Sequence, residues 1–176
     1  MKKELSYKSE DDKCYGITGM AIALVVFDGE DYLTSINLDA ETSDKMMEFT
    51  DEFYFAGNPE FSAKNVWNHI LKNFNLAMAL SVGNVLCRRL VFESKSVERD
   101  VIKSLLNLMN EVGRESCSLE SDETQHLFEK NVNYLNRIFS HHGVQSVAHD
   151  FAETLRSRRT MTRYEVVEQL RALSML

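Results

Sequence analysis

The chain has one proline in 176 residues, and beyond that proline its apolar residues recur with helical spacing. Proline disrupts a helix because it lacks a backbone N–H and because its ring clashes with the preceding turn. A proline-free segment with apolar residues three and four positions apart therefore favours amphipathic helices. From residue 62 onward the sequence predicts a mainly α fold, an antiparallel bundle of about five helices with short connections.

The first expected helix begins near Ser62 and has apolar residues on both sides between Trp67 and Cys87. Apolar residues around the whole circumference indicate a helix that runs through the middle of a domain. An unbroken helix would place Arg89 on the apolar stripe. We therefore expect a bend or a restart near Gly83, the alternative being that Arg89 is buried against an acid.

The other four helices are marked by their apolar stripes and by their end signals. The second covers Val97–Val112 and is expected to end at Gly113, because glycine commonly follows the last residue of a helix. The third covers Leu127–Phe139 and the fourth covers Val144–Leu155. The fifth begins at Thr162, which has a glutamate three residues later, in the spacing of a capping box.

The first part of the chain has the pattern of strands. Met20–Phe27 is rich in β-branched and aromatic residues, the turn-forming residues 28–31 follow it, and Tyr32–Asp39 alternates in polarity. This order predicts a β-hairpin. An isolated hairpin is only marginally stable, so we expect it to pack against the helices. Residues 40–60 fit a helix, a strand or a loop.

Charge is divided unevenly along the chain. Residues 1–60 hold 5 Lys and Arg against 14 Asp and Glu, whereas residues 61–176 hold 15 against 13, and the net charge is −7. An acidic chain is a poor candidate for coating nucleic acid or an anionic membrane. We expect a single domain over residues 1–176, in which the acidic hairpin and its connecting segment pack on the helical bundle of residues 61–176.

The sequence does not predict a membrane as a partner. The apolar run Ile17–Phe27 is shorter than the roughly 20 residues of a membrane-spanning helix, and Phe74–Phe92 contains two arginines that are costly in lipid. The three cysteines, Cys14, Cys87 and Cys117, are far apart and form no metal-binding pair. We expect reduced thiols and a cytoplasmic protein.

No catalytic motif is present. The nucleophile elbow G-x-S-x-G, the zinc motif H-E-x-x-H and the phosphate-binding Walker loop are all absent. We therefore predict no catalytic residue and no cofactor. A catalytic group that the fold assembles from distant residues leaves no local signature, so the question of enzyme activity stays open.

The candidate metal ligands are His142, His149 and Glu153. His149 and Glu153 are four residues apart on the expected fourth helix, which is the spacing of a two-ligand edge. The alternative is that these are solvated surface residues, and that His142 interacts with the carbonyl groups at a helix end.

Arginine is concentrated between Arg156 and Arg163. Guanidinium groups next to a helix N-terminus suit phosphate or carboxylate, so this segment is a candidate site for an anion or an acidic partner. Its expected site residues are Arg158, Arg159, Thr160, Thr162 and Arg163. The alternative is that the acidic residues of the first part of the chain neutralise these arginines.

Apolar and aromatic residues gather within the acidic segment that follows the expected hairpin. They are Met46, Met47, Phe49, Phe53, Tyr54 and Phe55. Packing in the core is their first expected use. The alternative is an interface with another chain, since aromatic residues and methionine are enriched in the cores of interfaces.

Three functions follow from these observations. The first is a non-enzymatic helical protein that acts through protein–protein contacts as a homodimer, or with another protein as its partner. The second is a small enzyme that binds a metal or an anion near His141, His142 and His149. The third is a regulator that binds nucleic acid weakly through Arg156–Arg163.

Overall fold

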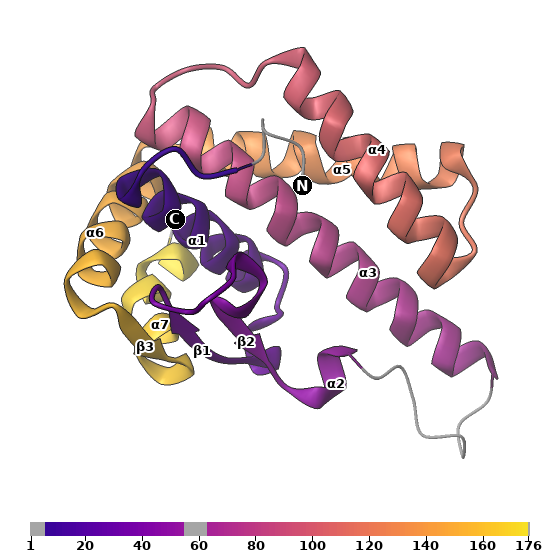
Figure 1. Ribbon diagram of the computed structural model, residues 1–176, viewed down its shortest axis with the longest axis horizontal. Helices are drawn as coiled ribbons and strands as arrows, with labels where there is room; N and C mark the ends of the chain where they lie inside the picture. The colour runs from indigo at the N-terminus through magenta and orange to yellow at the C-terminus, as the bar shows by residue number, and fades with distance from the viewer. Residues whose placement is uncertain (1–5, 55–62, 176) are drawn as a thin grey trace.

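The computed structural model describes residues 6–54 and 63–175 (Figure 1). In these residues it has seven α-helices and a small three-stranded antiparallel sheet, and 77% of it is helical. The helices are α1 (Glu10–Val26), α2 (Asp51–Tyr54), α3 (Ala63–Leu86), α4 (Arg99–Cys117), α5 (Ser121–Ser140), α6 (His142–Arg158) and α7 (Arg163–Leu170), and the strands are β1 (Leu33–Asn37), β2 (Met47–Phe49) and β3 (Thr160–Thr162). The predicted mainly α fold with a hairpin packed on helices is confirmed.

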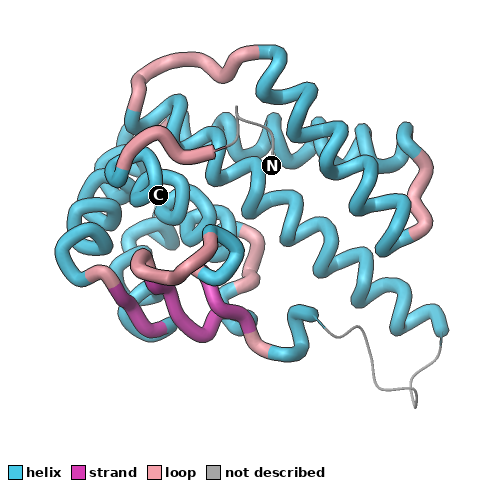
Figure 2. The backbone as a smooth tube through the Cα atoms, viewed as in Figure 1, coloured by secondary structure: helices cyan, strands magenta, loops and turns pink. Residues whose placement is uncertain are grey.

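Helix α3 runs diagonally through the molecule, with the other elements arranged around it (Figure 1). Helices α4 and α5 pack along it on one side, while α1 packs against its C-terminal half and α6 packs against α1. The three strands lie together at one corner, next to α7 (Figure 2). Because α3 touches α1, α4 and α5, it is the central helix that its apolar circumference predicted.

The first strand of the expected hairpin is wrong, because Met20–Phe27 belongs to α1 and the turn that follows it. Buried residues occur around the whole circumference of α1, so their spacing is not periodic. Periodicity cannot distinguish such a buried helix from a buried strand. Ser9 marks the start of the helix, since its hydroxyl accepts a hydrogen bond from the backbone N–H of Asp12.

Asp28 and Gly29 end α1 and do not turn a hairpin. Asp28 has a positive φ of 52°, its N–H donates to the Val25 carbonyl, and the N–H of Gly29 donates to the Leu24 carbonyl. This pair of bonds is the Schellman arrangement that closes many helices. The hairpin is therefore formed by β1 and β2. Its first strand, β1, lies where the sequence predicted the second strand of the hairpin.

Helices α1 and α3 cross at two glycines, Gly19 and Gly83. A Cβ atom on Gly19 would overlap the carbonyl oxygen of Gly83, so the two backbones are in direct contact. The expected break near Gly83 is wrong, because the glycine serves this close approach and the helix continues through it. Beyond Leu86 the chain forms a π-helical turn, Cys87–Phe92, in which Arg89 is buried and pairs with Glu93 at 2.6 Å.

Gly113 likewise lies inside a helix and not at its end. A Cβ atom there would come within 3.0 Å of both the Phe74 ring and the Thr124 hydroxyl, so this position lets α4 approach α3 and α5. Helix α4 ends at Cys117, and Ser118 after it takes the left-handed conformation with φ 53°. The expected end of the second helix was therefore about one turn too early.

The sheet has the strand order β2–β1–β3, and both pairings are antiparallel. Ile36 in β1 lies opposite Met47 on one side and Met161 on the other, and all three side chains are buried. The register shifts between Leu33 and Ser35. This irregularity puts Leu33 and Ile36 both into the core, although strict alternation assigns them to opposite faces.

The three cysteines are free and buried. One helical stretch among the described residues, Val66–Phe92, is long and apolar enough to cross a membrane by length and composition alone. In its most apolar window 61% is buried inside the molecule, as is usual for a central core helix.

Candidate functional site

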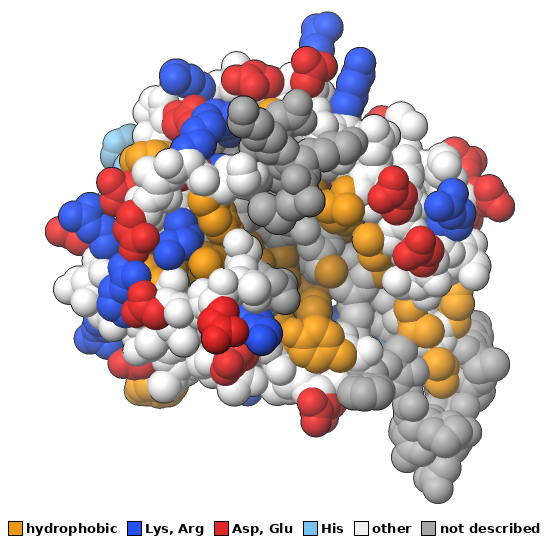
Figure 3. All heavy atoms as spheres, in the orientation of Figure 1, with side chains coloured by type: hydrophobic (Ala, Val, Ile, Leu, Met, Phe, Trp, Pro, Cys, Tyr) orange, Lys and Arg blue, Asp and Glu red, His pale blue; other side chains and the backbone are white. Residues whose placement is uncertain are grey.

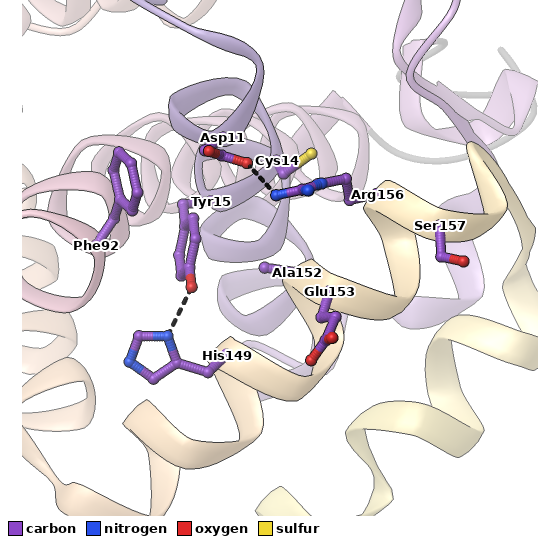
Figure 4. Close-up of a pocket in the computed structure, with 9 residues that line it drawn as sticks. All are labelled: Asp11, Cys14, Tyr15, Phe92, His149, Ala152, Glu153, Arg156 and Ser157. Atoms are coloured by element: carbon purple, nitrogen blue, oxygen red, sulfur yellow. Dashed lines mark hydrogen bonds and ion pairs between the residues drawn. The ribbon is translucent and has the colours of Figure 1, made fainter.

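A cleft of about 630 Å³ opens between α1 and α6 (Figure 4). We call it the α1–α6 cleft. Helix α1 and the π-helical turn line one side of it and α6 lines the other, with residues Asp11, Cys14, Tyr15, Phe92, His149, Ala152, Glu153, Arg156 and Ser157. Clefts of this size suit small ligands.

Three rings form one end of the cleft. The Tyr15 hydroxyl is 2.6 Å from Nδ1 of His149, and the Tyr15 ring stacks on Phe92 with 4.8 Å between centroids. Burial raises the pKa of Tyr15, and nearby thiols and carboxylates raise it further. The tyrosine is therefore a neutral hydroxyl at physiological pH, and it fixes the orientation of the imidazole at the cleft wall.

The other end of the cleft carries charge. Arg156 donates to Asp11 at 2.8 Å across the two helices, which occupies both groups. Glu153 projects from α6 between this pair and His149, and it has no hydrogen bond or ion pair with any residue that the structure describes (Figure 4). The cleft therefore contains one uncompensated carboxylate.

Cys14 and Ala152 are small buried residues between the two helices, at the base of the cleft. Burial, together with Glu10 and Asp11, raises the pKa of the Cys14 thiol. A thiol with a raised pKa holds little thiolate, which is the reactive form. Nucleophilic chemistry by Cys14 is therefore disfavoured.

A buried ion pair holds the start of α1 in position. The guanidinium of Arg88 donates to both carboxylate oxygens of Asp12 at 2.6 Å, and it also lies over the Tyr7 ring. Burial alone would raise the pKa of Asp12, but the hydrogen bonds from Arg88 and from the Lys8 backbone lower it overall. The adjoining Asp11 thereby has a fixed place at the cleft edge.

The predicted metal ligands come together only in part. His149 and Glu153 both line the cleft, whereas the exposed His142 does not, and His141 lines a separate cavity of about 310 Å³ beside Val26. Within the described residues no three His, Cys, Asp or Glu side chains are grouped to hold a metal ion. The three predicted ligands therefore do not form one site.

Each arginine between Arg156 and Arg163 faces a carboxylate. Besides the Arg156–Asp11 pair, Arg158 contacts Glu165 at 2.7 Å and Arg163 contacts Asp31 at 2.5 Å. Arg159 pairs with both Glu10 and Asp39. All of these partners except Glu165 come from the acidic first part of the chain, and Figure 3 shows the two signs interleaved over this side of the molecule.

An anion at this arginine cluster would have to displace those carboxylates. Thr160 and Thr162, the other expected site residues, form the exposed ends of β3, and Thr162 caps α7 by accepting a hydrogen bond from the Glu165 backbone. This arrangement matches the alternative expectation, in which acidic residues of the first part of the chain neutralise the arginines. Anion binding here remains a prediction.

The expected interface residues divide into two groups. Met46 and Met47 are buried in the core, so they offer no surface to another chain, which corrects that part of the expectation. Phe49 and Phe53 stack at 4.4 Å with Tyr32 beside them, and Tyr54 is 62% exposed. We call the four residues Tyr32, Phe49, Phe53 and Tyr54 the aromatic patch. Phe55 lies outside the described residues.

Sequence reasoning missed Asp11, Tyr15 and Phe92 as site residues. Asp11 and Tyr15 are four positions apart and share a helix face, but the segment next to them was assigned to a strand. Three acidic residues after Ser9 and an apolar run too long for a strand were available signals of a helix. Phe92 had no such signal, since its position depends on the π-helical turn.

Comparison with known proteins gives no relative. No protein-family model, no curated protein and no solved structure matches this chain. The functional argument therefore depends on the sites themselves.

Proposed function

We propose that this chain is a non-catalytic protein of the cytoplasm that acts through contacts with another protein chain, first of all a second copy of itself. The observation that carries the proposal is the aromatic patch. Its rings are packed against one another, yet Tyr54 is 62% exposed. Rigid, exposed aromatic side chains are typical of the centre of a protein interface.

The surroundings of the aromatic patch support this use. Asn73 of α3 donates to the backbone carbonyls of Glu52 and Phe53, which holds α2 and its rings in a fixed orientation. The exposed carboxylates of Asp51 and Glu52 form a polar rim. The Lys72 ammonium, 5.6 Å from the Tyr32 ring centroid, is a basic group that can meet this rim in a second copy.

Light scattering coupled to size exclusion, over a range of micromolar concentrations, tests this proposal. We expect a dimer whose fraction rises with concentration, and we expect Tyr54→Ser to shift it to monomer. Leu108→Ser is the control, because Leu108 is an apolar residue that is 41% exposed on α4, a helix that packs on α3 and α5. A strictly monomeric wild type, or an equal effect of the control, would contradict self-association through this patch.

Binding of nucleic acid through Arg156–Arg163 has less support. Every arginine of that segment has a carboxylate partner among the described residues. Phosphate contacts would first have to break those ion pairs. A filter-binding titration at low salt checks this, because phosphate contacts weaken steeply as salt rises.

A further inference from the structure

We propose that the α1–α6 cleft binds a small organic ammonium ion with an apolar part, the ammonium contacting Glu153 and the apolar part contacting Phe92 and Tyr15. This site is separate from the aromatic patch. Either proposal can therefore fail without the other.

The charges of the cleft select a cation. Among its lining residues Arg156 and Asp11 neutralise each other, and Glu153 has no partner within the described chain. One negative charge is therefore left uncompensated. A small anion is disfavoured because the guanidinium in the cleft is already engaged by a carboxylate.

The rings of the cleft favour an organic cation over a bare metal ion. Phe92 is 37% exposed and stacks on Tyr15, and both rings line the cleft that Glu153 also lines. Aromatic faces attract ammonium groups and also pack against apolar groups. No three His, Cys, Asp or Glu side chains of the described residues are grouped to hold a metal ion, and a stable site requires about four ligands.

The shape of the cleft suits such a ligand. Its base is formed by the small side chains Cys14 and Ala152, which leave room between α1 and α6. The rings of Phe92 and Tyr15 lie on one side of the cleft in Figure 4, and Glu153 and the Arg156–Asp11 pair lie on the other. A molecule with an apolar group and an amine a few bonds apart can contact both the rings and Glu153.

Calorimetric titration with three probes of one skeleton tests the charge selection. We expect phenethylammonium to bind, neutral phenethyl alcohol to bind more weakly, and anionic 3-phenylpropionate not to bind. If the alcohol or the anion binds as tightly as the ammonium, or if none of the three binds, the proposal is overturned.

Variants locate the site. We expect Glu153→Gln to weaken the binding of phenethylammonium by about fivefold, which is the effect of losing one solvent-exposed ion pair. Phe92→Leu should weaken it by about threefold through loss of the ring face. Glu111 is an exposed glutamate on α4, so Glu111→Gln removes the same charge and should have no effect on binding. Equal weakening by Glu111→Gln, or none by Glu153→Gln in a variant that melts like the wild type, overturns the assignment.

Discussion

At the scale of single residues, the ion pair of Asp12 and Arg88 is the feature with the largest expected effect on stability. Their side chains are only 2% and 5% exposed. Asp12→Asn removes the carboxylate charge that faces the buried Arg88 guanidinium. We expect this change to lower the free energy of unfolding by about 3–5 kcal/mol, measured by urea denaturation at pH 7. Asp11→Asn, which breaks an exposed pair, should cost less than about 1 kcal/mol.

The same pair predicts a pH dependence with a definite sign. The pKa of Asp12 is lower in the folded protein than in the unfolded chain, so folding is favoured when the carboxylate is ionised. This contribution is fully present above the unfolded pKa of about 4 and is lost as the pH falls through the folded pKa. The stability difference between wild type and Asp12→Asn should therefore shrink progressively as the pH falls below about 4. A constant difference across that range would contradict the ionised pair.

At the scale of elements, the crossing of α1 and α3 depends on the absence of a side chain at Gly19. Alanine normally stabilises a helix relative to glycine, by about 1 kcal/mol. At Gly19 the added methyl group would overlap the Gly83 backbone, which cannot move aside as a side chain can. We expect Gly19→Ala to destabilise the protein by about 3 kcal/mol, measured by thermal and urea unfolding.

Gly143 provides the matched control for that substitution. It lies in the first turn of α6 and is only partly buried, so Gly143→Ala should be neutral or slightly stabilising. If Gly19→Ala is also neutral, then the two helices are not in the close contact described above.

The elements also show how much of the fold local sequence could predict. The start of α7 follows from Thr162 and Glu165 alone, since a capping box involves four consecutive residues. Local sequence does not show that α1 is a helix, because its burial on all sides depends on contacts with α3 and α6. The α1–α6 cleft was missed for the same reason. Its residues come from Asp11 to Ser157 and meet only through tertiary packing.

At the scale of the whole molecule, the uneven charge of the sequence becomes a set of contacts between its two ends. Three arginines near the end of the chain, Arg156, Arg159 and Arg163, pair with carboxylates from the first forty residues. These pairs join α1 and the segments on either side of β1 to α6, to the residue after it and to α7. The acidic first part is thus held against the basic end of a chain whose net charge is −7.

Arg159 is the centre of this set, because it contacts both Glu10 and Asp39. Its hydrogen bonds lower the pKa of Glu10 and of Asp39, so both carboxylates favour the folded state above their unfolded pKa and lose that contribution in acid.

We expect Arg159→Ala to lower the melting temperature at neutral pH and low salt. The difference from the wild type should shrink in high salt, which screens exposed ion pairs, and as the pH falls below about 4 toward the lowered folded pKa values, where the carboxylates become protonated. Arg114→Ala, an exposed arginine on α4, is the control and should show neither dependence. A deficit of Arg159→Ala that is the same at all salt concentrations would mean that the arginine acts through packing of its alkyl chain and not through charge.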